Sequence, residues 1–253
     1  MDKHWLTEVD FPFDCSGFSI QPYIQPKVSK KNEHIIGVEI LGRLVNSNTG
    51  EVIPPNLFIP CLRDYDLGFQ YTIELIENTL LALSEANICN ISIAFNVDNC
   101  LIDKHEFIDC LIQVLTSQTL IPTYLITIEL TEHDLCRTQE KEEAIEVLRN
   151  HGITISLDDF GTGHATFDEL TAFSYGEVKV DRSIIKDYRP NSSNSILLEQ
   201  LVDFARVQKL KVVVEGIETR QILDKLKALH IDYFQGFLFY KPMSIRSFTT
   251  VYN

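Results

Sequence analysis

The chain of 253 residues has few positive charges: 22 lysine and arginine residues stand against 36 aspartate and glutamate residues, a formal net charge of −14 at pH 7. Proteins that bind DNA or RNA neutralise its phosphates with a basic surface, so a nucleic-acid polymer is excluded as the expected ligand. A small phosphorylated ligand would need local positive charge. In so acidic a protein we expect bound metal ions to supply that charge.

The sequence also lacks a long apolar run and a cysteine framework. No stretch approaches the roughly 20 uninterrupted apolar residues that a membrane-spanning helix needs. The first residues, MDKHWLTEVDF, lack the basic and then apolar order of a secretory signal. The six cysteines include no C-x-x-C pair, which disfavours zinc ligands and a disulfide framework. These absences predict a cytoplasmic protein that does not bind membranes.

No linker rich in glycine, serine or proline divides the chain, so a single domain over residues 18–253 is the simplest partition. Residues 1–17 are then a short N-terminal leader. Hydrophobic residues make up 45% and charged residues 23%, values that are ordinary for a globular protein and exclude a disordered or fibrous chain.

Strand-like segments recur along the sequence, each rich in isoleucine, valine, leucine, phenylalanine or tyrosine. They cover residues 18–24, 34–41, 91–97, 124–130, 153–159, 176–180, 210–215 and 233–239. Helix-like segments separate most of them, for example residues 138–151, 194–208 and 219–230. This alternation predicts a parallel sheet, and eight strands favour a closed, TIM-like (β/α)8 barrel over an open doubly wound sheet.

One junction breaks the alternation. The connector VSKKNE between the first two strands is shorter than the dozen or so residues of a parallel crossover. The first strand is therefore predicted to be antiparallel to the strands that follow it.

Polar residues lie at the ends of several predicted strands, where barrels of this kind carry their chemistry. They are Glu39, Asn96, Glu129, Asp158, Asp159, Lys179 and Glu215. Each one alone is most simply a solvated strand end. Converging carboxylates would repel each other without cations, however, and an all-oxygen set suits Mg²⁺ or Mn²⁺. The adjacent pair Asp158 and Asp159, followed by FGTG, favours such a metal site.

The donor set is large enough for two cations that share a carboxylate. Two such ions can activate a water and hold both sides of a phosphodiester. A lysine after a strand is commonly just solvated, but Lys179 beside the ions could orient the nucleophile or offset phosphate charge. The residues by themselves therefore predict a metal-dependent phosphoester hydrolase and name no substrate.

These residues belong to a longer series of motifs that occur in a fixed order. The motifs are QP at 25–26, GVEILGR at 37–43, FIP at 58–60, IELTE at 128–132, LDDFGTG at 157–163, VKVDRSII at 178–185, VVVEGIET at 212–219 and QGFLFYKP at 235–242. From about Phe18 to about Val251 the chain thereby resembles the EAL-domain family of bacterial cyclic-di-GMP phosphodiesterases. The resemblance implies hydrolysis of cyclic-di-GMP to linear pGpG with two Mg²⁺ or Mn²⁺ ions.

The resemblance also implies roles for single residues. One metal would be held by Glu39, Asn96, Glu129 and Asp158, and a second by Asp158, Asp159 and Glu215. Lys179 would help to hold the attacking water, so the implied catalytic residues are Glu39, Asp159, Lys179 and Glu215. Ligand contacts would come from Gln25, Leu41, Arg43 and Gln235. Arg43 would fork onto a phosphate. The LDDFGTG loop would be supported by Glu132, Thr162 and Glu218.

The sequence departs from the family pattern where Glu-Ala-Leu reads Glu39-Ile40-Leu41, and where the usual tryptophan is Leu44. If Ile40 pointed into the barrel, its bulk would displace the Glu39 carboxylate. Two alternatives therefore stand beside an active enzyme: a cyclic-di-GMP receptor without useful turnover, and a protein-binding regulator that reuses the barrel. The resemblance further implies a homodimer, against which a monomer is the alternative.

Overall fold

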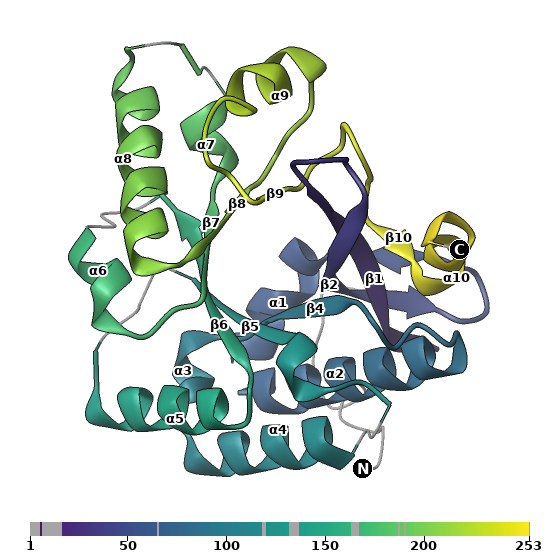
Figure 1. Cartoon of the computed structure of the whole chain (residues 1–253). Coiled ribbons are helices and arrows are strands. Elements are labelled where there is room, and N and C mark those ends of the chain that lie inside the picture. Colours follow the sequence, from purple (N-terminus) through teal and green to yellow (C-terminus); the bar gives the residue numbers. More distant parts are fainter. Residues whose placement is uncertain are drawn as a thin grey trace.

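The structure, a computed structural model, describes Leu6 and residues 17–64, 66–117, 120–131, 137–162, 167–186, 188–189 and 191–252. Figure 1 shows a ring of strands with helices arranged around it. The barrel strands are β1 (Phe18–Ser29), β2 (Ile35–Asn46), β4 (Ser92–Asn96), β5 (Ile126–Thr131), β6 (Thr154–Phe160), β7 (Glu177–Val180), β8 (Lys211–Val214) and β9 (Tyr233–Phe234). The short strands β3 (Val52–Ile53) and β10 (Met243–Ser244) extend the sheet at its rim.

The pairing of β1 closes the ring. Strands β2, β4, β5, β6, β7, β8 and β9 pair in this order and run parallel, while β1 pairs antiparallel with both β2 and β9. The predicted TIM-like barrel with an antiparallel first strand is therefore confirmed. The turn at residues 30–34 joins β1 to β2 directly, which is why those two strands cannot run parallel.

The helices cover the outside of the barrel. They are α1 (Pro55–Asp64), α2 (Gly68–Glu85), α3 (Asn99–Ile102), α4 (His105–Ser117), α5 (Gln139–Asn150), α6 (Phe167–Ala172), α7 (Arg182–Ile185), α8 (Ser193–Gln208), α9 (Arg220–Leu226) and α10 (Ile245–Tyr252), with a 3-10 turn at Thr123–Leu125. The hydroxyls of Thr138 and Thr219 cap α5 and α9 by accepting from the backbone N–H groups of Lys141 and Ile222. Among the described residues no helix is both long and apolar enough to cross a membrane.

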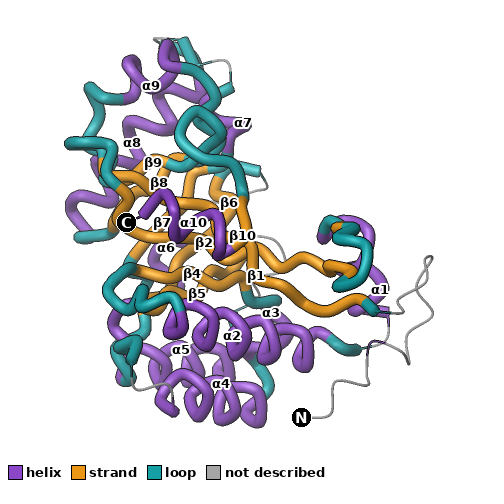
Figure 2. The backbone as a smooth tube through the Cα atoms, turned by 90° about the vertical axis from the view of Figure 1, so that its right-hand side faces the viewer, coloured by secondary structure: helices purple, strands orange, loops and turns teal. Residues whose placement is uncertain are grey.

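Three strand ends differ from the sequence-based prediction. Strand β1 runs to Ser29 instead of ending at residue 24, and β2 runs to Asn46 instead of ending at residue 41, because the two strands pair along most of their length. Figure 2 shows these two strands extending past the other strands towards α1. Strand β9 ends after Phe234 because Gly236 passes close to the backbone of Ile217, where a Cβ would lie 2.2 Å from the carbonyl oxygen. The QGF segment is therefore a loop at the barrel mouth and not a strand.

Side chains alternate between the two faces of the barrel wall. On β1 and β2 the apolar Ile24 and Ile40 are fully buried on one face, while their neighbours Gln25 and Glu39 lie opposite each other on the other face. The apolar core therefore lies between the barrel and its helices. The barrel interior, by contrast, holds buried polar and charged side chains on most strands.

Candidate active site

The parallel register brings the polar strand ends to one end of the barrel. Glu129 on β5 lies beside Asn96 on β4, and Asp158 on β6 lies beside Thr131 at the end of β5. Glu39 is on β2, and Glu215 follows β8 directly. Residues that are far apart in the sequence thus meet because parallel strands place their carboxyl ends at one edge.

The acidic residues form two groups that share Asp158. Carboxylate oxygens of Glu39, Glu129 and Asp158 lie within 4.8 Å of one another, and so do those of Asp158, Asp159 and Glu215. Asn96 adjoins the first group, since its Nδ2 donates to Glu39 Oε1 at 2.8 Å. The two groups have the composition that the family resemblance implies for two metal sites.

Lys179 on β7 lies at the centre of these carboxylates with only 1% of its surface exposed. Its Nζ is 2.8 Å from Glu129 Oε2, 2.8 Å from Glu215 Oε1, 3.1 Å from Asp158 Oδ1 and 3.7 Å from Glu39 Oε2. Burial opposes the lysine charge, but the surrounding carboxylates, Asp158 and Glu129 foremost, outweigh it and raise the pKa of Lys179 well above its usual value. Lys179 is therefore an ammonium ion.

The carboxylates exceed the positive charge that Lys179 supplies. Burial raises the pKa of Asp158 well above its usual value and raises the pKa of Glu215 to about 7, although Lys179 acts in the opposite direction. A divalent cation between these oxygens would reverse both shifts by favouring the ionised forms. Because every donor is a carboxylate or amide oxygen, the residues fit a hard cation such as Mg²⁺ or Mn²⁺.

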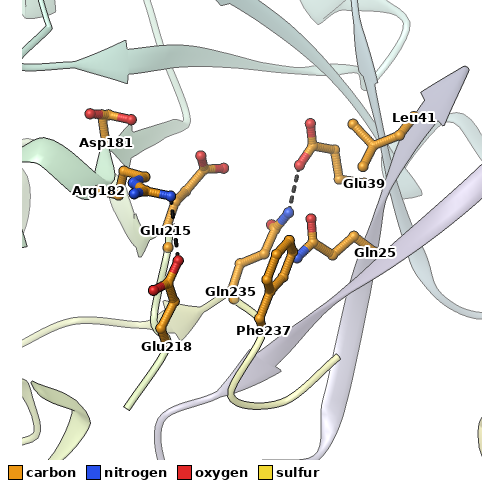
Figure 3. Close-up of a pocket in the computed structure, with 11 residues that line it drawn as sticks. Gln25, Glu39, Leu41, Asp181, Arg182, Glu215, Glu218, Gln235 and Phe237 are labelled. Carbon is orange, nitrogen blue, oxygen red and sulfur yellow. Dashed lines mark hydrogen bonds and ion pairs between the residues drawn. The ribbon is translucent and has the colours of Figure 1, made fainter. Parts of the chain in front are cut away.

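A cavity of about 280 Å³ is lined in part by Glu39 and Glu215 of this cluster, and Figure 3 shows the side chains that line it. Gln235 is 3% exposed and donates through Nε2 to Glu39 Oε2 at 2.6 Å. Its Oε1 is buried and has no hydrogen-bond partner among the described residues, so this side chain keeps an unused acceptor beside the cavity. Gln25 donates to the Tyr240 carbonyl at 3.2 Å, and Leu41 forms part of the same wall.

Arg43 belongs to a second cavity of about 390 Å³, which shares Glu39 and Leu41 with the first. The Arg43 guanidinium donates from Nη1 to the Gly42 carbonyl at 2.8 Å and lies over the Tyr23 ring at 5.6 Å. Tyr71 packs against Gly42, where a Cβ would lie 1.9 Å from the tyrosine hydroxyl. A glycine is required here for the tyrosine to approach the strand beside Arg43.

Near the end of β6, where its register with β7 shifts between Leu157 and Phe160, Asp159 has an uncommon backbone conformation, with φ of 59°. The Asp159 N–H donates to Asp158 Oδ1 at 2.8 Å, and Thr162 donates to the Asp159 carbonyl from its N–H at 3.1 Å and from its hydroxyl at 2.9 Å. Glu218 pairs with Arg182 of α7 at 3.3 Å, so its contact is with the segment after β7. Glu132 lies outside the described residues.

Ile40 does not point into the barrel. Alternation along β2 places it on the face opposite to Glu39, where it lines the second cavity with Leu62, Thr72 and Leu75 of the surrounding helices. The displacement of Glu39 that an inward Ile40 would cause is therefore not expected.

Sequence reasoning missed two buried residues beside the cluster. Lys27 is 4% exposed, and its Nζ lies 2.8 Å from Glu129 Oε1 and 3.1 Å from Glu177 Oε1. The two residues are Lys27 and Glu177. Lys27 is two residues after Gln25, and Glu177 is two residues before Lys179, so alternation along each strand places them on the inner face of the barrel. The sequence alone could therefore have indicated that both side chains point inward. Phe237, 55% exposed on the first cavity, was missed as well.

The comparison with protein families decides where this arrangement belongs. Residues 14–242 match the family model of the EAL domain. The chain belongs to the EAL-domain family. The resemblance of the motifs is thus confirmed over most of the chain.

Two curated relatives are named as cyclic di-GMP phosphodiesterases. The chain is 29% identical over 245 residues to the cyclic di-GMP phosphodiesterase PdeL of Escherichia coli, covering 95% of this chain and 67% of PdeL. It is 27% identical over 231 residues to the cyclic di-GMP phosphodiesterase RocR of Pseudomonas aeruginosa, covering 90% of this chain and 58% of RocR. The chain thus spans roughly half to two thirds of the length of these relatives.

Solved structures have the same architecture. The PaMucR phosphodiesterase in complex with c-di-GMP matches with a TM-score of 0.81 and 26% identity, covering 90% of this chain and 99% of that one. An EAL domain protein from Listeria monocytogenes EGD-e matches with a TM-score of 0.83 and 24% identity, covering 92% of both chains. The EAL-domain barrel therefore accounts for nearly all of this chain.

Proposed function

We propose that this chain hydrolyses the bacterial second messenger cyclic-di-GMP to linear pGpG. The observation that carries the proposal is that two groups of three acidic residues share Asp158 and lie around the buried Lys179. Support comes from the names of the relatives PdeL and RocR and from the c-di-GMP complex of PaMucR. Each residue type that the resemblance implies for the metal positions is present in the cluster.

We propose that the first cation is held by Glu39, Asn96, Glu129 and Asp158, and the second by Asp158, Asp159 and Glu215. When bound, such ions supply an activated water and neutralise charge on the phosphodiester. Charge counting supports two ions. The six carboxylates of the interior, Glu177 included, and the ammonium groups of Lys27 and Lys179 leave four negative charges, which two divalent cations would balance.

The protein's own residues supply orientation and charge. Lys179 holds an ammonium among the carboxylates, where it can orient the attacking water and offset negative charge on the phosphate. Arg43 can exchange its contact with the Gly42 carbonyl for a forked contact with a phosphate. The amides of Gln25 and Gln235 can pair with polar edges of the ligand, and the exposed Phe237 ring offers a face for stacking a guanine base.

The remaining expectations from the sequence extend this proposal. We propose that Thr162, Glu132 and Glu218 support the loop that carries Asp158 and Asp159. The hydrogen bonds from Thr162 to the Asp159 carbonyl favour that role for Thr162. A cytoplasmic location and a homodimer remain predictions.

Incubation of the purified chain with cyclic-di-GMP and Mg²⁺, with products separated by chromatography, tests the proposal. We expect linear pGpG to accumulate with time. Tight binding without product would instead make the chain a receptor. Neither binding nor product would make it a regulator that reuses the barrel, and either result would overturn the proposed activity.

A further inference from the structure

A buried ion pair lies next to the carboxylate cluster on the antiparallel strand of the barrel. Lys27 is on β1, and its Nζ contacts Glu129 Oε1 at 2.8 Å and Glu177 Oε1 at 3.1 Å. The side chains of Lys27, Glu129 and Glu177 are 5%, 0% and 9% exposed. None of these contacts reaches the cavity, whose lining contains neither Lys27 nor Glu177.

The two oxygens of Glu129 face different partners. Oε2 accepts from Lys179, which also contacts Asp158 and Glu215, so this oxygen faces the carboxylate cluster. Oε1 accepts from Lys27, which is bound in turn by Glu177. Glu129 is thus held between two ammonium groups, and only one of its oxygens is directed at the other candidate ligands.

We propose that Lys27 is a positioning residue for Glu129, and that Glu177 keeps Lys27 directed at it. The proposal rests on the proposed function, in which Glu129 is a metal ligand. Lys27 occupies Oε1 and thereby fixes the carboxylate plane so that Oε2 points into the cluster. Partners that orient a metal ligand in this way commonly change metal affinity or activity by about 10- to 100-fold when removed.

Electrostatics alone predicts the opposite change in cation affinity when Lys27 is removed. An ammonium group near a cation site repels the cation, so loss of Lys27 would strengthen cation binding if only its charge mattered. A merely structural ion pair would leave cation affinity unchanged, because apolar residues commonly replace buried pairs without loss of fold. The direction of the change in metal affinity therefore separates positioning from both other roles.

The test is Mn²⁺ affinity measured without ligand, by calorimetry or by electron paramagnetic resonance of free Mn²⁺, in wild type and two variants. Lys27→Met removes the ammonium group and keeps most of its length. Lys27→Met combined with Glu177→Gln removes one charge of each sign, so the net charge of the interior is unchanged. We expect both variants to bind Mn²⁺ about 10- to 100-fold more weakly than wild type.

A matched control exists outside the barrel. Lys141 on α5 is 2% exposed and lies 3.3 Å from Asp103, whose side chain is 36% exposed. Lys141→Met with Asp103→Asn therefore removes an ion pair whose two residues belong to neither group of candidate ligands. We expect wild-type Mn²⁺ affinity in that control, with the fold of every variant checked by circular dichroism.

Each outcome decides the proposal. Unchanged or tighter Mn²⁺ binding in a folded Lys27 variant would overturn it. If Lys27→Met alone failed to fold, the charge-neutral double variant would decide, and failure of both with a folded control would make Lys27 a folding element instead. If wild type itself bound no Mn²⁺, the metal centre of the proposed function would fail, and not the positioning of Glu129 alone.

Discussion

Carboxylates meet basic side chains in two different settings in this chain. At the β1–β2 turn, Glu33 accepts from Arg220 at 2.7 Å and from Lys227 at 2.8 Å, and all three side chains are partly exposed. Inside the barrel, Lys179 meets four carboxylates with almost no exposure. The first setting has more bases than acids, and the second has more acids than bases.

The difference appears in the pKa values. Hydrogen bonds from Lys227 and Arg220 lower the pKa of Glu33, so this carboxylate is simply ionised. In the barrel, burial raises the pKa of Asp158 and Glu215 even though Lys179 is adjacent. The turn cluster, Glu33 with Arg220 and Lys227, links the β1–β2 turn to α9 and the residue that follows it. The carboxylates around Lys179, by contrast, carry more negative charge than the basic side chains beside them can balance. Such a site attracts cations.

Among the single substitutions, Asp159→Asn should have the largest effect, which is a loss of hydrolysis. The change is nearly isosteric and removes one negative charge from the second group of proposed ligands. We expect single-turnover cleavage of cyclic-di-GMP to fall about 100-fold or more. Equilibrium binding of the ligand should stay close to wild type, because the first group is intact. Near-normal cleavage would remove Asp159 from the centre, and loss of folding would make it a loop anchor.

The next largest effect is on how the free energy of unfolding depends on pH when excess chelator removes metal ions. With a pKa raised from 4.5 to about 7, Glu215 keeps a proton in the folded protein that the unfolded chain has already released. The free energy of unfolding should therefore fall as the pH rises through this window, by up to about 3 kcal/mol. Glu215→Gln should remove that part of the slope. Denaturant unfolding of both proteins at pH 5 and pH 8 measures it, and equal slopes would contradict the assignment.

A smaller effect is expected at the rim, where Arg43 contacts the Gly42 carbonyl. Loss of a charged hydrogen-bond partner costs about 1.5 to 3 kcal/mol, so Arg43→Ala should weaken cyclic-di-GMP binding roughly 10- to 100-fold. Arg43→Lys should recover only part of this, because an ammonium group cannot make a forked contact. Unchanged affinity in both variants, measured by calorimetry, would exclude Arg43 from ligand binding.

The smallest effect is expected in the turn cluster. Glu33→Gln should change the free energy of unfolding by less than about 1 kcal/mol, because exposed ion pairs contribute little. Hydrolysis should be unchanged. A loss of activity comparable to that of Asp159→Asn would contradict the distinction between the two clusters.

The barrel and most of the cluster could be predicted from sequence because both follow strand periodicity and strand order. The short connector after β1 predicted its antiparallel direction, and the polar residues within β2 and towards the ends of β4, β5 and β6 predicted which residues meet. The lengths of the strands were harder to predict from the sequence. The early end of β9 depends on the contact between Gly236 and Ile217, two segments whose proximity no local pattern reveals.

Other features depend on tertiary contacts in the same way. The two-residue period places Lys27 on the same face of β1 as Gln25, but only the closed barrel brings it to Glu129, which is 102 positions away. The orientation of Ile40 could have been inferred from alternation with Glu39, because neighbouring residues of a strand point to opposite faces. The packing of Tyr71 on Gly42 could not, because α2 and β2 meet there only through the fold.

The most direct test is hydrolysis of cyclic-di-GMP by the purified chain after metal removal and stepwise return of Mn²⁺, with bound Mn²⁺ counted in parallel. Two groups of carboxylates that share Asp158 predict no turnover in excess chelator, and recovery as about two Mn²⁺ ions per chain are bound. Full turnover in excess chelator would contradict a metal-dependent centre in this barrel.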